Sequence, residues 1–217
     1  EYIDATCPLV KKVHREAVKF SEGKRHVVLI GHKGHQEMIG TAGYIDPVFL
    51  HVVQNVDDIH AIDLPSDTPI SYVTQTTLSL DDAQDMIVAL KKKFHDIEGP
   101  TKEDICYATQ NRQDAVKELA DICDVIIICG SPNSSNSNRL RETGERAGAT
   151  TYIIDSAGEL DPDWIDDKTC IGISSGASVP NWIVEDLIER IQGLFPGSNV
   201  YSIGESDEPK TFPIPEI

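Results

Sequence analysis

Long apolar runs are missing from this sequence, and none approaches the roughly 18 residues that a membrane-spanning helix requires. There is no secretory signal pattern either. We therefore expect no membrane partner. The chain begins at Glu1 without an initiating methionine, in the middle of a recognisable pattern, so we expect its 217 residues to be a piece of a longer polypeptide.

Basic residues are also scarce. The chain has 19 Lys and Arg against 36 Asp and Glu, which gives a formal net charge of −17. A surface of this kind repels polyanions, so we expect neither nucleic acid nor an anionic membrane as a partner. An anionic small molecule would need a local polar pocket that works against the overall field.

Several motifs that define catalytic classes are absent, namely CxxC, HExxH, a Walker loop, a GxSxG elbow and an aspartate cluster. Their absence disfavours a phosphate-ester-handling α/β enzyme. Five cysteines, an odd number without a secretory signal, indicate a reducing compartment and no disulfide framework. Cys123, Cys129 and Cys170 lie in or beside apolar runs, and we expect them in the core. Cys7 and Cys106 lie in polar, turn-like settings.

The most informative stretch is residues 130–140, GSPNSSNSNRL, which follows the apolar run 125–129. A β-branched run that ends in glycine is typical of a buried parallel strand. Ser and Asn favour helix N-caps, and the free N–H groups at a helix start attract anions. The stretch is therefore either an anion site or an ordinary capped loop.

Strands and helices alternate along the chain, which predicts an α/β fold with parallel sheets. We expect strands at residues 27–30, 48–53, 70–73, 125–129, 152–155 and 170–173, and helices at 8–22, 78–94, 114–122, 139–147 and 181–194. The Gly99-Pro100 pair breaks the pattern. We place one unit at residues 1–98, a second at 99–194, and an irregular tail at 195–217.

The two units match each other at a fixed offset of 99 residues, without a gap. The matched pairs are Cys7 and Cys106, Gly31 and Gly130, His35 and Ser134, Glu37 and Asn136, and Ser79 and Ser178. This regularity predicts two tandem related units, each with a parallel sheet.

Ligands of such sheets lie outside the carboxyl ends of the strands. If the units face each other, the following side chains converge on one cavity: Cys7, Cys106, His35, Glu37, Thr76, Ser134, Asn136 and Ser178. The set combines two soft sulfur ligands, an acid and neutral donors suited to an anion. Two cysteines are too few for an iron–sulfur cluster or a structural zinc site, so the residues alone predict an incomplete thiolate site beside an anion pocket.

Six blocks resemble the LytB family, the 4-hydroxy-3-methylbut-2-enyl diphosphate reductases. They are DATCPLV (4–10), GHKGHQE (31–37), TQTTLS (74–79), ICYATQNRQ (105–113), GSPNSSNSNRL (130–140) and SSGASVP (174–180). The resemblance implies a fold of three pseudo-symmetric α/β units around a [4Fe-4S] cluster that three cysteines hold, with one iron free for substrate. Cys7 and Cys106 match two of these cysteines. The resemblance implies that the third belongs to an N-terminal domain, which we expect this chain to lack.

The resemblance also implies an activity: two-electron reductive dehydroxylation of (E)-4-hydroxy-3-methylbut-2-enyl diphosphate to isopentenyl and dimethylallyl diphosphate, in the non-mevalonate isoprenoid pathway. The partners implied are this allylic diphosphate and an electron donor such as ferredoxin or flavodoxin. The location implied is the bacterial cytoplasm or the plastid stroma. We expect the 217-residue piece alone to be inactive.

Individual roles follow from the same resemblance. Glu37 matches the proton donor, Thr76 lies close to the substrate hydroxyl, Thr77 is in the site region, and His32 is structural or peripheral. The diphosphate-binding set is His35, Ser134, Ser135, Asn136 and Ser178.

Simpler interpretations stay open for these residues. The acid could be a surface carboxylate near a helix start, the histidine a cap or core residue, the threonine and serines plain N-caps, and the cysteines unremarkable thiols. The alternative function is a diphosphate-binding fragment without a cluster.

Overall fold

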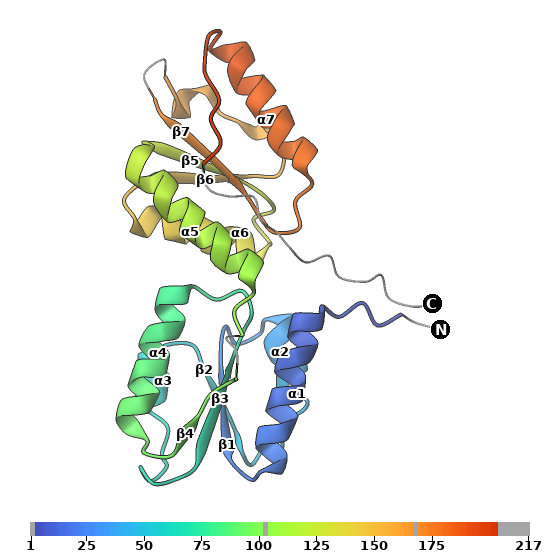
Figure 1. Ribbon diagram of the computed structural model, residues 1–217, viewed down its shortest axis with the longest axis vertical. Helices are drawn as coiled ribbons and strands as arrows, with labels where there is room; N and C mark the ends of the chain where they lie inside the picture. Colours follow the sequence, from blue (N-terminus) through green and yellow to red (C-terminus); the bar gives the residue numbers. More distant parts are fainter. Residues whose placement is uncertain (1–2, 102–103, 167–168, 204–217) are drawn as a thin grey trace. The chain divides into compact units, whose positions relative to one another are not determined.

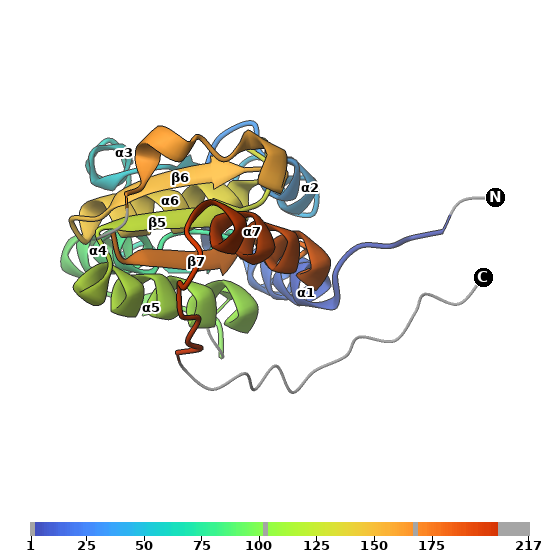
Figure 2. The ribbon, with the colours of Figure 1, turned by 90° about the horizontal axis from the view of Figure 1, so that it is seen from above.

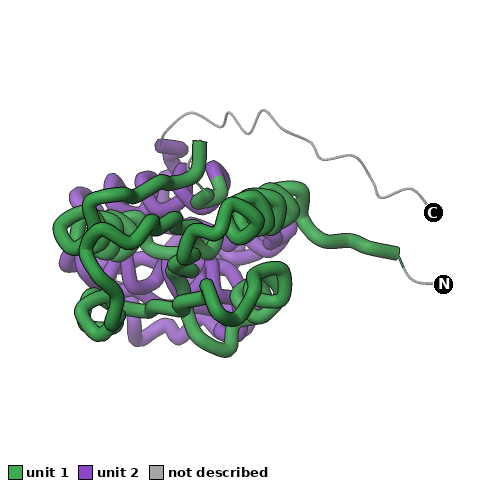
Figure 3. Tube along the Cα trace, turned by 90° about the horizontal axis from the view of Figure 1, so that it is seen from below, with its two compact units in different colours: residues 1–106, 209–217 green, residues 107–208 purple. Residues whose placement is uncertain are grey.

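A computed structural model describes residues 3–101, 104–166 and 169–203. The chain divides into two compact units, with residues 1–106 in the first and residues 107–208 in the second (Figure 3). The division expected after residue 98 falls earlier than this. Asp104 and Cys106 stay with the first unit because they hydrogen-bond there: the amide of Cys106 donates to the carbonyl of Thr76, and the Asp104 carboxylate accepts from the amide of Thr74.

The first unit is a parallel sheet between two helical layers. Its elements are α1 (Pro8–Glu22), β1 (His26–Ile30), α2 (Gln36–Ala42), β2 (Leu50–Val53), α3 (Val56–His60), β3 (Ile70–Thr74), α4 (Leu80–Lys93) and β4 (Ile97–Glu98). The strand order is β2-β1-β3-β4, and all pairs are parallel. Helices α1 and α2 cover one face, and α3 and α4 cover the other (Figure 1).

Strand β1 shows why both faces must be covered. Val27 and Leu29 pack with the apolar residues of α1, whereas Val28 and Ile30 pack with those of α3 and α4. All four side chains are at most 1% exposed. An uninterrupted apolar run is what a strand buried on two faces requires.

The second unit has the same design with fewer strands. Its elements are α5 (Tyr107–Ile122), β5 (Val125–Cys129), α6 (Ser135–Arg146), β6 (Thr150–Ile154), η1 (Ala157–Glu159), η2 (Pro162–Trp164), β7 (Ile171–Ser175) and α7 (Asn181–Leu194). The order β6-β5-β7 is again parallel. Helix α7 packs on one face, and α5 and α6 pack on the other (Figure 2).

The internal repeat is confirmed in its first part. Helices α1 and α5 begin at Pro8 and Tyr107, and strands β1 and β5 begin at His26 and Val125, each pair 99 residues apart. The expectation of a gap-free register is wrong further along. The offset grows to 101 at β3 and β7 and at α4 and α7, because 41 residues separate β5 from β7 whereas 39 separate β1 from β3. Ser178 therefore corresponds to Thr77 and not to Ser79.

Other elements differ from expectation. The sequence pattern did not predict α2, α3 or β4, and α6 begins at Ser135, four residues before the expected start. Cys123 and Cys129 are buried as expected, but the expectation for Cys170 is wrong: it is exposed because it lies just before β7, outside the apolar clusters. The expected irregular tail holds for residues 195–203, which contain no helix or strand, and its remainder lies outside the described residues.

Within the described parts of the chain, every helix is too short or too polar to cross a bilayer.

Candidate functional site

Two adjacent strands of the first unit end side by side. Ile30, the last residue of β1, pairs with Thr74, the last residue of β3, so the segments that follow both strands emerge at the same edge. The amide of Gln75 donates to the carbonyl of Ile30 over 2.8 Å. Gly31 is required here, because a Cβ on this residue would lie 2.8 Å from the Cβ of Gln75. The edge is therefore built by close backbone packing.

The Glu37 carboxylate is held at this edge by one residue. Its Oε1 accepts a hydrogen bond from the amide of Thr76 over 2.8 Å, and its Oε2 accepts one from Thr76 Oγ1 over 2.9 Å. Burial raises the pKa of Glu37 above its ordinary value, and the two hydrogen bonds to the charged form only oppose that rise. The structure thus brings together the two residues predicted to be catalytic.

His35 is the N-cap of α2, two positions before Glu37. Its Nδ1 accepts a hydrogen bond from the amide of Glu37 over 3.3 Å, which requires the proton of the neutral ring to be on Nε2. Partial burial lowers the pKa of His35, so the neutral form is favoured. The capping role considered from the sequence is therefore correct, and it leaves Nε2 as a donor.

Gln75 joins two loops at the same edge and was missed by sequence reasoning. Its Oε1 accepts from the amide of His32 over 3.0 Å, and its Nε2 donates to Thr77 Oγ1 over 2.8 Å. Gln75 is 1% exposed, so these bonds are shielded from water. The position of Gln75 within the TQTTLS block was the signal that could have found it.

Both predicted metal-ligating cysteines are free thiols at this end of the first unit. Cys7 is exposed and immediately precedes α1, and Cys106 is half-buried. The amide of Cys106 donates to the carbonyl of Thr76 over 2.9 Å. Thr76 therefore contacts Glu37 through its amide and hydroxyl, and Cys106 through its carbonyl.

A second buried carboxylate, Asp104, supports these segments and was also missed. Its side chain is fully buried; Oδ2 accepts from the amide of Thr74 over 3.0 Å, and Oδ1 lies 3.0 Å from Lys12 Nζ. Glu16 Oε2 lies 3.7 Å from the same ammonium. Burial and the nearby Asp104 raise the pKa of Glu16 to about 7. Lys12 and Glu16 belong to the helix that begins beside Cys7.

The donor types at this edge suit an iron–sulfur cluster, since thiolates are its usual ligands. Two thiolate ligands are fewer than such a cluster needs. Among residues 3–101, 104–166 and 169–203, no group of three or more His, Cys, Asp or Glu side chains is arranged to hold a metal ion. Cys7 and Cys106 therefore stay the candidate ligands that the sequence predicts.

In the second unit, the residues predicted to bind diphosphate lie where β5 and β7 end. Ser134 caps α6, and its hydroxyl accepts from the amide of Ser137 over 3.3 Å. Ser135 is the first residue of that helix and is half-buried, and Ser178 is exposed in the turn after β7. The structure therefore groups these serines at one edge of one unit.

Asn136 is the buried member of this group. It is 8% exposed, and neither its Oδ1 nor its Nδ2 has a hydrogen-bond partner among the described residues. A buried amide without a partner is destabilising until a ligand or water satisfies it. Gly130, at a φ of +156°, and Gly176 let the backbone approach this helix start, because a Cβ on either glycine would meet the hydroxyl of Ser137.

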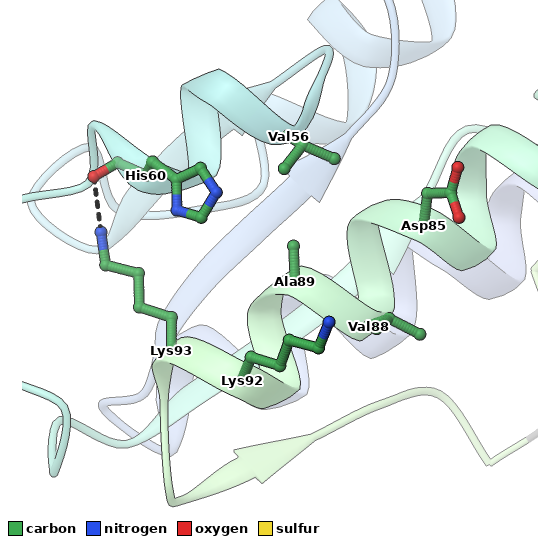
Figure 4. Close-up of a pocket in the computed structure, with 7 residues that line it drawn as sticks. All are labelled: Val56, His60, Asp85, Val88, Ala89, Lys92 and Lys93. Carbon is green, nitrogen blue, oxygen red and sulfur yellow. Dashed lines mark hydrogen bonds between the residues drawn. The ribbon is translucent and has the colours of Figure 1, made fainter.

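A cavity on another part of the first unit contains none of the predicted site residues. It measures about 650 Å³ and lies between α3 and α4, where Lys93 Nζ donates to the carbonyl of His60 over 2.8 Å (Figure 4). Its lining residues are Val56, His60, Asp85, Val88, Ala89, Lys92 and Lys93. None of the predicted site residues is among them. The predicted convergence of both units on one cavity stays a prediction.

In both units, polar side chains that can contact a ligand lie where the parallel strands end. This arrangement is typical of the class of α/β proteins whose ligands bind outside the carboxyl ends of the strands. The model of the LytB protein family matches residues 1–192. The chain belongs to the LytB family, and the resemblance drawn from its six blocks is confirmed.

Individual relatives agree with this assignment. The chain is 53% identical to 4-hydroxy-3-methylbut-2-enyl diphosphate reductase 1 of Rhodopseudomonas palustris, over 89% of this chain and 63% of that protein. It is 48% identical to the reductase of Marinobacter nauticus, over 98% of this chain and 68% of that one. It also resembles a solved structure of the reductase from Plasmodium falciparum, with a TM-score of 0.84, 36% identity, and coverage of 88% of this chain and 59% of that chain. The α/β architecture with parallel sheets is therefore that of the family.

Proposed function

We propose that this chain supplies the proton donor, two cluster ligands and part of the diphosphate site of a 4-hydroxy-3-methylbut-2-enyl diphosphate reductase. The chain spans 63% of the length of its Rhodopseudomonas relative, so the activity is proposed for a protein that includes these residues together with the rest of the family's length. The products are isopentenyl and dimethylallyl diphosphate.

The observation that carries the proposal is the Glu37–Thr76–Cys106 connection. Reductive loss of a hydroxyl as water needs a proton beside the departing oxygen. A carboxyl whose pKa is raised by burial retains that proton at a higher pH than an exposed one does. Thr76 links it to the amide of Cys106, a proposed cluster ligand, through bonds of 2.8 to 2.9 Å.

The protein's own groups have distinct tasks in this scheme. When Glu37 is protonated, it delivers its proton to the substrate hydroxyl. Thr76 fixes the carboxyl through its amide and its hydroxyl. The hydroxyl oxygen of Thr76 keeps lone pairs that can accept a hydrogen bond from the substrate hydroxyl. Gln75 holds the hydroxyl of Thr77, and so orders the adjacent part of the same loop. When bound, the [4Fe-4S] cluster supplies electrons and a Lewis-acidic iron, which no side chain can provide.

The diphosphate is assigned to neutral donors. His35 retains Nε2–H as a donor because its Nδ1 is engaged by the amide of Glu37. Ser134, Ser135 and Asn136 lie at the start of α6, where free backbone N–H groups also favour an anion, and Ser178 follows β7. The unsatisfied amide of Asn136 supports its place in this set. In a protein with a net charge of −17, an anion needs a local polar pocket of this kind, because the overall field opposes its binding.

Glu37→Gln in a protein that supports turnover tests the proposal. The amide side chain can still accept from Thr76, so iron content and thermal stability should stay close to wild type. Turnover with a chemical reductant should fall by about 10² to 10⁴, the range for a general acid. Glu22→Gln, at the exposed C-terminal end of α1, is the matched control and should keep full turnover. Normal turnover of Glu37→Gln would remove Glu37 from the mechanism.

A second candidate function is favoured by the small number of proposed cluster ligands. With two candidate cysteines, the 217-residue chain on its own could bind diphosphate without holding a cluster. Anaerobic reconstitution with iron and sulfide, followed by an iron count and a visible spectrum, separates the two. We expect no stable cluster in the isolated chain and a stable one in the longer protein. The electron donor proposed for the longer protein is a ferredoxin or a flavodoxin.

A further inference from the structure

Two cysteines of the second unit touch each other, and neither of them is a proposed cluster ligand. The Sγ atoms of Cys123 and Cys170 lie 3.4 Å apart. Cys123 follows α5, and Cys170 immediately precedes β7. The two residues are 47 positions apart, so chain proximity does not cause the contact.

The backbone around this pair is fixed by reciprocal hydrogen bonds. The amide of Asp124 donates to the carbonyl of Cys170 over 3.0 Å, and the amide of Cys170 donates to Asp124 Oδ2 over 3.1 Å. The amide of Val125 also approaches the carbonyl of Cys170, at 3.4 Å. The two thiols are therefore held next to each other by bonds that do not involve the sulfur atoms.

A disulfide has an S–S distance of about 2.05 Å, so closure from 3.4 Å requires the sulfur atoms to approach by about 1.4 Å. Rotation about the two Cα–Cβ bonds moves both sulfur atoms and leaves the hydrogen-bonded backbone in place. No other side chain has to be displaced from between two atoms that are already in contact.

The two thiols differ in access, which assigns them different roles. Cys170 is exposed, whereas Cys123 is 9% exposed and packs in the apolar cluster with Val116, Leu119 and Ile126. Burial and the neighbouring Cys170 raise the pKa of Cys123 to about 12. Ordinary core packing accounts for Cys123. It does not account for Cys170, which belongs to neither apolar cluster of this unit.

We propose that Cys123 and Cys170 are a redox modification site that forms a reversible disulfide with small disulfide oxidants. The Cys170 thiolate attacks one sulfur of a disulfide such as oxidised glutathione and releases one glutathione thiolate, which leaves a mixed disulfide. Cys123 then gives its proton to a released glutathione thiolate, attacks Cys170 Sγ and releases the second glutathione. Two protein thiols are oxidised, and one small disulfide is reduced to two thiols by the same two electrons.

The cross-link would close a loop that contains β5, α6 and β6. A covalent closure of this length restricts the unfolded chain, so the oxidised protein should melt several degrees higher than the reduced one. The site lies at the start of β5 and β7, whereas Gly130 and Gly176 follow the ends of these strands. The inference is therefore independent of the proposed reductase chemistry.

The test starts from the fully reduced 217-residue chain, which is incubated with oxidised glutathione under argon, alkylated and digested for mass spectrometry. The expected product is a peptide pair joined through Cys123 and Cys170, with a higher melting temperature that dithiothreitol reverses. Cys170→Ala should abolish both effects, and because this residue is exposed, the variant should fold. Cys129→Ala, in a buried strand, is the matched control and should still form the link.

A third variant separates the two steps. In Cys123→Ala, the mixed disulfide on Cys170 should persist, with a mass gain of one glutathionyl group. If the wild-type chain shows the same persistent adduct, or links only Cys7 with Cys106, the assignment of Cys123 and Cys170 is overturned.

Discussion

Asp104→Asn is the sharpest probe of how the first unit holds its strand ends together. The Asp104 carboxylate accepts from the amide of Thr74 and faces the ammonium of Lys12, both at 3.0 Å. Asparagine keeps the shape but turns one of the two acceptors into a donor. In either orientation of the asparagine side chain, its NH₂ group faces another donor, which is either the Thr74 backbone amide or the Lys12 ammonium.

The size of the expected stability loss depends on how deeply Asp104 is buried and on Glu16, a second carboxylate near Lys12. Breaking a buried ion pair by removing one partner costs about 3–5 kcal/mol, and a hydrogen bond to a charged group contributes about 1.5–3 kcal/mol. Asp104 is fully buried, but the Lys12 side chain is 24% exposed and Glu16 lies 3.7 Å from its ammonium. We therefore expect a loss of about 2 kcal/mol in the free energy of unfolding, below the value for a fully buried pair.

The pH profile gives a second signature. Glu16 has its pKa raised from 4.5 to about 7 by burial first and by Asp104 second, so the folded state binds its proton more tightly than the unfolded state does. The contribution of Glu16 to the free energy of unfolding is therefore most favourable below about pH 4.5 and declines as the pH rises toward 7. In Asp104→Asn the burial remains but the neighbouring charge is gone. In the variant, the free energy of unfolding should therefore decline less with rising pH, and the decline should end at a lower pH.

The assay is urea unfolding followed by far-ultraviolet circular dichroism between pH 4.5 and 8, together with hydrogen exchange of the Thr74 amide. Exchange at Thr74 should accelerate in the variant, because its acceptor is weakened. Asp67→Asn is the matched control: Asp67 is 87% exposed and pairs with His95 on the surface, so the change should stay below about 0.5 kcal/mol. Wild-type stability, an unchanged pH profile and unchanged exchange at Thr74 would together refute the role given to Asp104.

Two further substitutions test the edges of the sheets. Gly31→Ala should destabilise the chain by about 1–3 kcal/mol in urea unfolding, because its new Cβ would lie 2.8 Å from the Cβ of Gln75; a neutral effect would show that this edge is loosely packed. Ser134→Ala should cost about 1 kcal/mol, because it removes the cap that accepts from the amide of Ser137. Unchanged exchange of that amide would contradict the capping role.

The sequence was most informative where local pattern and burial agree. The run 125–129 is a fully buried strand, and α7 has the predicted bounds of Asn181–Leu194. The start of α6 was misplaced because Ser and Asn are weak helix formers, so the row at 133–138 resembled a loop. The Ser134 cap and the burial of Asn136 and Ser137 outweigh that weak propensity.

The sequence predicted residue types for the site but not the contacts between them. The sequence pointed to Glu37, Thr76 and Cys106, but not to the fact that Thr76 contacts both of the others. Gln75 and Asp104 were missed because their partners are 43 and 30 residues away along the chain. A single sequence contains local signals for a cap or a strand but none for which distant backbone amide a buried side chain will bind.

The shared capping position of α2 and α6 bears on how such a protein can change over evolution. His35 and Ser134 occupy the same place in the two units, 99 residues apart, and each accepts a hydrogen bond from its own helix. Capping requires only an acceptor, which histidine, serine, asparagine and aspartate all provide. A substitution among these residues alters the group offered to a ligand while the helix still begins at the same residue. After a duplication, such a position lets the two copies acquire different chemistry with little risk to either fold.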